Sequence, residues 1–205
     1  MKFTLLSLLF TTALASPVVD LEKRHLSSTR NDLNDGKCGS VLVIYARGTT
    51  EAGNVGLIAG PPFFRTLDDL VDDLAVQGVD YPADVAGYLA GGSTAGATTM
   101  ANLVAKAVSS CPNTKIVLSG YSQGAQVTHL AAAKIPASSY PRIAAIVVFG
   151  DPYEGYAFPG TLNNNVKTFC NVGDKICLGL PIVLAPHLTY GLDADEAAEY
   201  VAARV

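Results

Sequence analysis

Charged side chains are scarce in this sequence of 205 residues, and it contains no run of basic residues. Only 16% of the residues are Asp, Glu, Lys or Arg, 49% are apolar, and the formal net charge is −4. Nucleic-acid-binding proteins usually carry a basic patch that follows the phosphate backbone, so this composition argues against a nucleic-acid partner. A chain of this length and apolar content predicts one globular domain with a full hydrophobic core.

Long apolar runs are also missing, apart from one at the N-terminus. No later run approaches the ~20 residues that a membrane-spanning helix requires, so we expect no stable membrane insertion. Residues 1–15 combine Lys2, the apolar stretch Phe3–Phe10 and the small residues Ala13-Leu14-Ala15. This layout predicts a secretory signal peptide.

A second processing step is indicated by the dibasic pair Lys23-Arg24. Cleavage after this pair removes residues 16–24 as a propeptide and leaves residues 25–205 as the mature domain, with His25 at its N-terminus. We therefore expect a soluble, monomeric protein that is secreted to the extracellular space.

The paired C-x-x-C spacing and neighbouring histidines of a zinc site are absent as well. Four cysteines in a secreted chain suggest two disulfides, for which three pairings exist. Cys170 and Cys177 enclose only six residues and are natural partners, which leaves Cys38 to pair with Cys111. The second bridge closes a long loop, for which chain-entropy models give roughly 4 kcal/mol of stabilisation. We expect no metal ion and no other cofactor.

Predicted strands and helices alternate along the chain. The continuous apolar runs Val41–Tyr45 and Ile143–Phe149 are typical of strands buried on both faces of a sheet. Further strands are predicted at Val79–Pro82, Ile116–Leu118, Val166–Phe169 and Ile182–Leu184, and helices at Phe64–Val76, Ala95–Val108, Gln126–Ala133 and Ala194–Arg204. The alternation predicts an α/β fold: a three-layer, α/β-hydrolase-like sandwich whose central, mostly parallel five-stranded sheet is covered by helices on both faces.

The pentapeptide Gly120-Tyr121-Ser122-Gln123-Gly124 carries the strongest functional signal. It is a G-x-S-x-G sequence with a strand-like run before it and a helix-compatible run after it. A strand that turns abruptly into a helix leaves no room for side chains beside the serine, and it presents the serine hydroxyl at the free N–H groups of a helix N-terminus. Ser122 is therefore the predicted nucleophile; the alternative is a glycine-rich turn with an exposed serine.

Histidine is scarce, and elimination selects the general base. A serine hydroxyl needs a base to take its proton, and at neutral pH this base is usually histidine. His25 lies at the processing junction, and His129 lies seven residues beyond Ser122 on the same predicted helix, about 10 Å along its axis. His187 is the histidine that remains.

A catalytic triad needs a third residue, an acid that orients the histidine, and chain order does not determine which residue this is. In α/β hydrolases this residue lies between the serine and the histidine, and Asp151, Glu154 and Asp174 all qualify. Asp151 directly follows a predicted strand, whereas Asp174 lies in the loop that a disulfide encloses. Spacing does not decide among them.

The polar loop Arg47–Asn54 follows the first strand, at the sheet edge where ligands gather in open α/β sheets. Thr49 in this loop is the best candidate to join the backbone N–H of Gln123 in an oxyanion hole.

These residues closely resemble those of fungal cutinases, small secreted serine esterases that share a carbohydrate esterase family with acetylxylan esterases. The resemblance covers nearly all of the predicted mature chain. It rests on the segments Thr29–Leu33, Tyr45–Glu51, Gly120–Gly124, Cys170–Cys177 and Ala185–Gly191.

The resemblance implies that Asp174 is the triad acid, that the disulfides are Cys38–Cys111 and Cys170–Cys177, and that Thr49 and Gln123 form the oxyanion hole. It also implies that no lid covers the site. One feature departs from the family: some cutinases carry an asparagine in the loop matching Tyr88–Gly92 that steadies the oxyanion residue, and this loop has none.

The implied activity is hydrolysis of cutin, an insoluble polyester, and of short to medium acyl esters. The alternatives are deacetylation of xylan by the same triad, and a non-catalytic surface-interaction protein on this scaffold. The predicted acyl groove consists of Leu89, Tyr121, Val183 and Leu188, whose alternative role is core packing. The apolar run Ile182–Leu184 favours an acyl chain over an acetylated sugar, so the expected partner is an insoluble polyester or a small ester.

Overall fold

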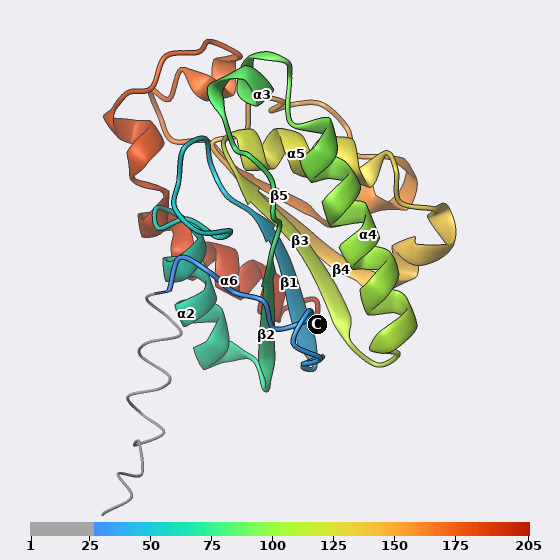
Figure 1. Cartoon of the computed structure of the whole chain (residues 1–205). Helices are drawn as coiled ribbons and strands as arrows, with labels where there is room; N and C mark the ends of the chain where they lie inside the picture. The colour runs from blue at the N-terminus through green and yellow to red at the C-terminus, as the bar shows by residue number, and fades with distance from the viewer. Residues whose placement is uncertain (1–26) are drawn as a thin grey trace, which may run out of the picture.

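Five parallel strands form one open sheet in the order β2-β1-β3-β4-β5. The structure is a computed structural model that describes residues 27–205 (Figure 1). The predicted signal peptide, the predicted propeptide and His25 lie outside the described residues. The strands are β1 (Val41–Ala46), β2 (Leu74–Gly78), β3 (Lys115–Tyr121), β4 (Ile143–Phe149) and β5 (Val166–Phe169). All four strand pairings are parallel, which agrees with the predicted α/β sandwich.

Helices cover both faces of this sheet and make it the middle of three layers (Figure 1). The α-helices are α2 (Gly60–Leu70), α3 (Val85–Leu89), α4 (Thr94–Ser110), α5 (Gln123–Ala132) and α6 (Ala194–Ala202). Helices α2 and α6 pack together on one face, and α4 and α5 pack together on the other. Short 3₁₀ helices lie at Ala137–Arg142, Gly160–Asn165, Ile176–Leu178, Ala185–Leu188 and Tyr190–Asp193.

Alternate residues of each central strand point to opposite layers, as the two-residue period of a strand requires. Leu42 and Ile44 of β1 belong to the core under α4 and α5, where Met100 also lies. Val43 and Tyr45 belong to the core under α2 and α6. Because both faces are buried, the strand reads in the sequence as a continuous apolar run.

Three predicted elements differ from the structure. The predicted helix Phe64–Val76 is shorter, because α2 ends at Leu70 and Asp73 takes a left-handed conformation with φ 53°. The following residues Leu74–Gly78 form β2, in register with Val41–Tyr45. The predicted strands Val79–Pro82 and Ile182–Leu184 are not strands. The run Ile182–Leu184 is exposed and pairs with no strand among residues 27–205, so its apolar side chains are not explained by burial in the sheet.

Two disulfides tie loops to this frame. Cys38–Cys111 joins the segment before β1 to the end of α4, and Cys170–Cys177 closes the loop after β5. Both pairings are those predicted from the sequence. Within residues 27–205, no helix combines the length and apolarity needed to cross a membrane.

Candidate active site

The serine turn joins β3 directly to α5, and backbone crowding explains both of its glycines. A Cβ atom at Gly120 would lie 2.2 Å from the carbonyl oxygen of Gly124, and a Cβ atom at Gly124 would lie 1.9 Å from that of Ala46. Neither separation is possible for a real side chain. Ser122 itself has φ 57° and ψ −118°, a conformation that costs energy for any residue except glycine and that is typical of functional turns.

The position of this turn follows from the topology of the sheet. Strands β1 and β3 are neighbours, although β2 separates them in the chain. Their carboxyl ends flank the crevice where ligands bind in open α/β sheets. Thr49 follows β1 and Ser122 follows β3 at this point. Ser122 is only 6% exposed, and its side chain lines a groove.

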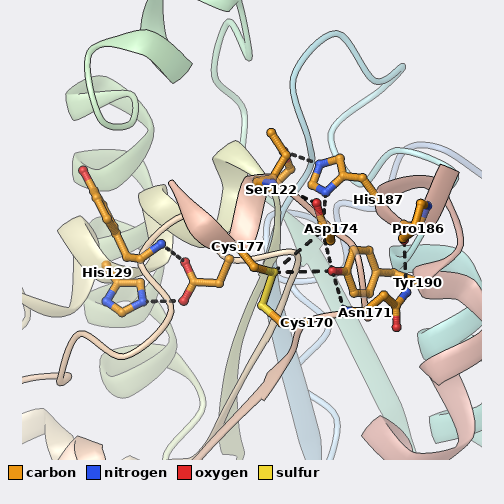
Figure 2. Close-up of a disulfide and its surroundings, with 12 residues drawn as sticks. Ser122, His129, Cys170, Asn171, Asp174, Cys177, Pro186, His187 and Tyr190 are labelled. Carbon is orange, nitrogen blue, oxygen red and sulfur yellow. Dashed lines mark hydrogen bonds and ion pairs between the residues drawn. A yellow bond between two sulfur atoms is a disulfide. The ribbon is translucent and has the colours of Figure 1, made fainter. Parts of the chain in front are cut away.

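Three segments that are distant in sequence bring a serine, a histidine and an aspartate into one hydrogen-bonded row (Figure 2). His187 Nε2 lies 3.0 Å from Ser122 Oγ, and His187 Nδ1 lies 2.7 Å from Asp174 Oδ2. All three residues are buried. In this arrangement the carboxylate accepts from Nδ1–H and keeps Nε2 free to take the serine proton, which is the geometry of an activated nucleophile.

The other two candidate acids lie elsewhere. Asp151 Oδ2 is 2.8 Å from His129 Nε2, and Asp151 Oδ1 accepts from the backbone N–H of Tyr153. His129 in turn stacks on Phe158 at a centroid distance of 3.9 Å. Glu154 is exposed, and its pKa is raised by partial burial and by the nearby charges of Asp151 and Asp174. The molecule therefore has a second Asp–His pair, in which Asp151 is buried and His129 partly buried, but this pair does not contact Ser122.

The residues of the predicted oxyanion hole contact each other. Gln123 is the first residue of α5, so its backbone N–H has no intrahelical acceptor. Its side-chain Nε2 donates to Thr49 Oγ1 at 2.9 Å and to the carbonyl oxygen of Asp84 at 2.7 Å. Because Thr49 Oγ1 accepts this bond, the hydroxyl keeps its own proton to donate. Gln123 thus steadies Thr49 although the Tyr88–Gly92 loop lacks an asparagine.

Glu51 organises the loop that carries Thr49, a role that the sequence did not reveal. Its Oε2 accepts from the backbone N–H of Gly48 at 2.7 Å, and its Oε1 accepts from those of Leu57 and Ile58 at 2.9 Å. The three-residue separation of Gly48 and Glu51 is the only local signal, and it is too common a spacing to identify such a contact.

A groove of about 650 Å³ opens above Ser122. It contains all four predicted groove residues, and three of these are largely exposed: Leu89 (65%), Val183 (57%) and Leu188 (52%). Core packing does not explain these three side chains. The remaining lining is also mostly apolar and includes Leu57, Ile58, Val85, Tyr88, Ile176 and Pro181.

Tyr121, the fourth predicted groove residue, is only 2% exposed and supports the histidine. Its hydroxyl donates to the backbone carbonyl of His187 at 2.7 Å, and the two rings lie 5.0 Å apart. Burial, followed by the charges of Glu51 and Asp174, raises the pKa of Tyr121, so the phenol stays protonated and remains a donor.

Possible metal ligands gather at one place among residues 27–205, where Glu154, Cys170 and Cys177 bring their ligand atoms within 4.8 Å of one another. The two sulfurs are joined in a disulfide, so neither is a thiolate that binds a metal. All four cysteines of the chain are paired in disulfides.

Comparisons with known proteins agree on one group of relatives. A family model described as Cutinase matches residues 37–205. The chain is 51% identical to cutinase CUT1 of Coprinopsis cinerea over the full length of both chains. It is 45% identical to a cutinase of Botryotinia fuckeliana, with 86% of this chain and 88% of that one covered.

Solved structures point the same way. A Trichoderma reesei cutinase in complex with a phosphonate inhibitor is 44% identical and superposes with a TM-score of 0.81, covering 90% of this chain and 83% of that one. An acetyl xylan esterase is 22% identical with a TM-score of 0.65, covering 82% of this chain and 99% of that one. This second likeness concerns the fold alone.

Proposed function

Because the chain belongs to the cutinase family of carboxylic ester hydrolases, we propose that it is a secreted serine esterase that cleaves cutin and short to medium acyl esters. The observation that carries this proposal is the row Ser122–His187–Asp174 in an apolar groove. The family assignment leaves no support for the non-catalytic alternative. Secretion is supported by the two disulfides and by the signal-peptide pattern of residues 1–15.

The geometry supports an acyl-enzyme mechanism. Ser122 Oγ attacks the ester carbonyl while His187 Nε2 takes its proton, and Asp174 stabilises the imidazolium that forms. The backbone N–H of Gln123 and the donors of Thr49 stabilise the negative charge on the carbonyl oxygen. His187 then protonates the leaving alcohol. In the second half, a water molecule attacks the acyl group, with His187 acting again as base and then as acid.

The groove favours an acyl chain over an acetylated sugar. Burial of an alkyl chain is worth about 0.8 kcal/mol per methylene, and exposed apolar side chains such as Leu89, Val183 and Leu188 supply the surface for it. The exposed run Ile182–Leu184 continues this apolar surface at the groove margin. Acetylxylan hydrolysis remains the second candidate, because the same row Ser122–His187–Asp174 could cleave an acetyl ester.

Substrate preference is tested with p-nitrophenyl esters from acetate to palmitate, alongside cutin and acetylxylan. We expect the highest kcat/KM on short to medium acyl chains and release of soluble products from cutin. A high rate on acetylxylan beside a negligible rate on esters longer than acetate would reject the cutin proposal in favour of the second candidate.

The nucleophile is tested with Ser122→Ala, which we expect to lower kcat by roughly 10⁶-fold while the circular dichroism spectrum is unchanged. Ser119→Ala on the same strand is the matched control, because Ser119 is fully buried and its hydroxyl has no hydrogen-bond partner among the described residues. This control should keep normal activity. More than trace turnover by folded Ser122→Ala would reject Ser122 as the nucleophile.

A further inference from the structure

Tyr190 places a second hydrogen-bond donor on the aspartate of the row. Its hydroxyl lies 2.6 Å from Asp174 Oδ2, the same oxygen that lies 2.7 Å from His187 Nδ1 (Figure 2). The other carboxylate oxygen, Asp174 Oδ1, accepts from the backbone N–H of Ile176 at 2.9 Å. Three donors therefore share the charge of one buried carboxylate, and two of them meet on the oxygen that faces the imidazole.

The direction of the Tyr190 bond follows from its surroundings. Tyr190 is fully buried, and burial, together with its bond to Asp174, raises its pKa far above the usual range. The phenol is therefore protonated and donates to the carboxylate. Its oxygen accepts from the backbone N–H of Asn171 at 3.0 Å, so both the donor and an acceptor position of the hydroxyl are used.

The ring of Tyr190 is fixed by packing, so the hydroxyl is held in place. It contacts Tyr121, Phe149 and His187 at centroid distances of 5.8, 6.2 and 5.9 Å. Gly150 allows this approach, because a Cβ atom there would lie 2.7 Å from the Tyr190 ring and 2.8 Å from the His187 ring. The aromatic core thus aims the phenol at Asp174.

The disulfide loop that carries Asp174 is also joined to the segment of His187 and Tyr190 by the side chain of Asn171. Asn171 Nδ2 donates to the carbonyl oxygen of Pro186 at 3.1 Å and to Thr189 Oγ1 at 3.3 Å. The disulfide loop that carries Asp174 and the segment that carries His187 and Tyr190 therefore form one connected unit. Within this unit, Tyr190 supplies the side-chain hydroxyl that donates directly to the carboxylate.

We propose that Tyr190 is a positioning residue of the triad: it holds Asp174 Oδ2 against His187 Nδ1 and withdraws part of the negative charge that the imidazole meets. This inference rests on the proposed serine esterase function. Its physical consequence is that the hydroxyl limits how tightly His187 holds its proton. A hydrogen bond to a charged group is among the stronger ones in proteins, so its removal has a measurable effect.

The test is Tyr190→Phe, which keeps the packed ring and removes only the hydroxyl. Without this donor, Asp174 Oδ2 carries more charge and binds Nδ1–H more strongly. We expect the low-field proton NMR resonance of His187 Nδ1–H to move further downfield. The acidic limb of the kcat/KM profile should move to higher pH, because His187 stays protonated longer. We also expect kcat to fall about tenfold while KM changes by less than about twofold, because the carboxylate loses the donor that fixes its orientation toward the imidazole.

Tyr45→Phe is the matched control. Tyr45 is also fully buried and lies in the same core, but its hydroxyl has no hydrogen-bond partner among the described residues. The control should leave the resonance, the pH profile and kcat unchanged.

Two outcomes would overturn the inference. In one, Tyr190→Phe matches Tyr45→Phe in all three measurements. In the other, kcat falls while the resonance and the acidic limb stay in place, because this pattern indicates general loosening of the fold. The resonance does not depend on turnover, so the experiment separates the two proposals. A downfield shift in a protein whose wild type lacks esterase activity would support the role of Tyr190 and reject the proposed function.

Discussion

The two Asp–His pairs of this molecule allow a matched test of which aspartate acts in the triad. Asp174 faces His187 at 2.7 Å, and Asp151 faces His129 at 2.8 Å. Both aspartates are nearly inaccessible to solvent, with exposed fractions of 3% and 1%. Replacing each by asparagine keeps the side-chain size and removes the charge. The two variants therefore differ mainly in whether the paired histidine contacts Ser122.

The loss expected for Asp174→Asn follows from its three donors. If the amide oxygen of the new asparagine faces Ile176 N–H, its NH₂ group points at the donors of His187 and Tyr190. If the oxygen faces His187 and Tyr190, the NH₂ group points at Ile176 N–H, so in both orientations two donors face each other. His187 can relieve this conflict by placing its proton on Nε2, but that tautomer cannot accept the proton of Ser122. We expect kcat to fall on the order of 10⁴-fold, as for the equivalent change in a serine protease, which corresponds to ~5.5 kcal/mol.

Asp151→Asn should leave catalysis almost intact. The amide oxygen can still accept from Tyr153 N–H, and the amide NH₂ can donate to a neutral His129 whose proton is on the other ring nitrogen. The change then weakens one charge-assisted bond, and we expect a loss of about 1–2 kcal/mol in the free energy of unfolding. The kcat of this variant should stay within about twofold of wild type, because no bond to the triad is altered.

The assay is kcat on p-nitrophenyl butyrate at neutral pH, with thermal melting followed by circular dichroism. A collapse of kcat in Asp151→Asn beside a nearly normal Asp174→Asn would refute the assignment of the acid. It would also refute the reasoning that distance to His187 identifies this residue.

Two further predictions concern the frame of the site. Removing the short bridge with Cys170→Ser and Cys177→Ser should mainly lower kcat, with a smaller effect on the melting temperature, because this loop holds Asp174. Removing the long bridge with Cys38→Ser and Cys111→Ser should mainly lower the free energy of unfolding, by roughly 4 kcal/mol for a loop of this length. Normal kcat in the first double variant would show that Ile176 and Tyr190 hold Asp174 without the bridge. Gly124→Ala should prevent folding, because its Cβ atom would lie 1.9 Å from the backbone oxygen of Ala46. Gly155→Ala is the control: its Cβ atom would meet no atom within 4 Å, so the variant should lose only the ~1 kcal/mol of unfolding free energy that a left-handed conformation costs alanine. Soluble, active Gly124→Ala would contradict the crowding argument.

Sequence patterns alone predicted the α/β class and the nucleophile turn. Both depend on local rules: a strand buried on both faces must be apolar throughout, and a strand that turns at once into a helix must have glycine where backbone atoms crowd. The pairing of Cys170 with Cys177 also followed from short separation in the chain. His187 could be predicted as the general base because the chain has only three histidines and the other two were unsuitable.

The helix-to-strand boundary at β2 was not predictable in this way. Leu74 and Ala75 match a helical spacing with Leu67 and Leu70, and the same residues also form a short apolar run suited to a strand. Their pairing with β1 decides between the two, and this pairing depends on a strand that lies about 30 residues earlier in the chain. Local pattern carries no information on such a contact.

Residue spacing left the acid and the role of the apolar groove side chains open, and beyond the family resemblance only tertiary contacts separate the candidates. Asp151, Glu154 and Asp174 all satisfy chain order, and only the folded molecule shows that Asp151 meets His129 while Asp174 meets His187. Leu89, Val183 and Leu188 are as apolar as any core residue, and their exposure at the groove distinguishes them from core residues. The contact of Tyr190 with Asp174 spans 16 residues and two loops. Hydrogen bonds between side chains depend on distances of a few tenths of an ångström, and long-range packing sets those distances.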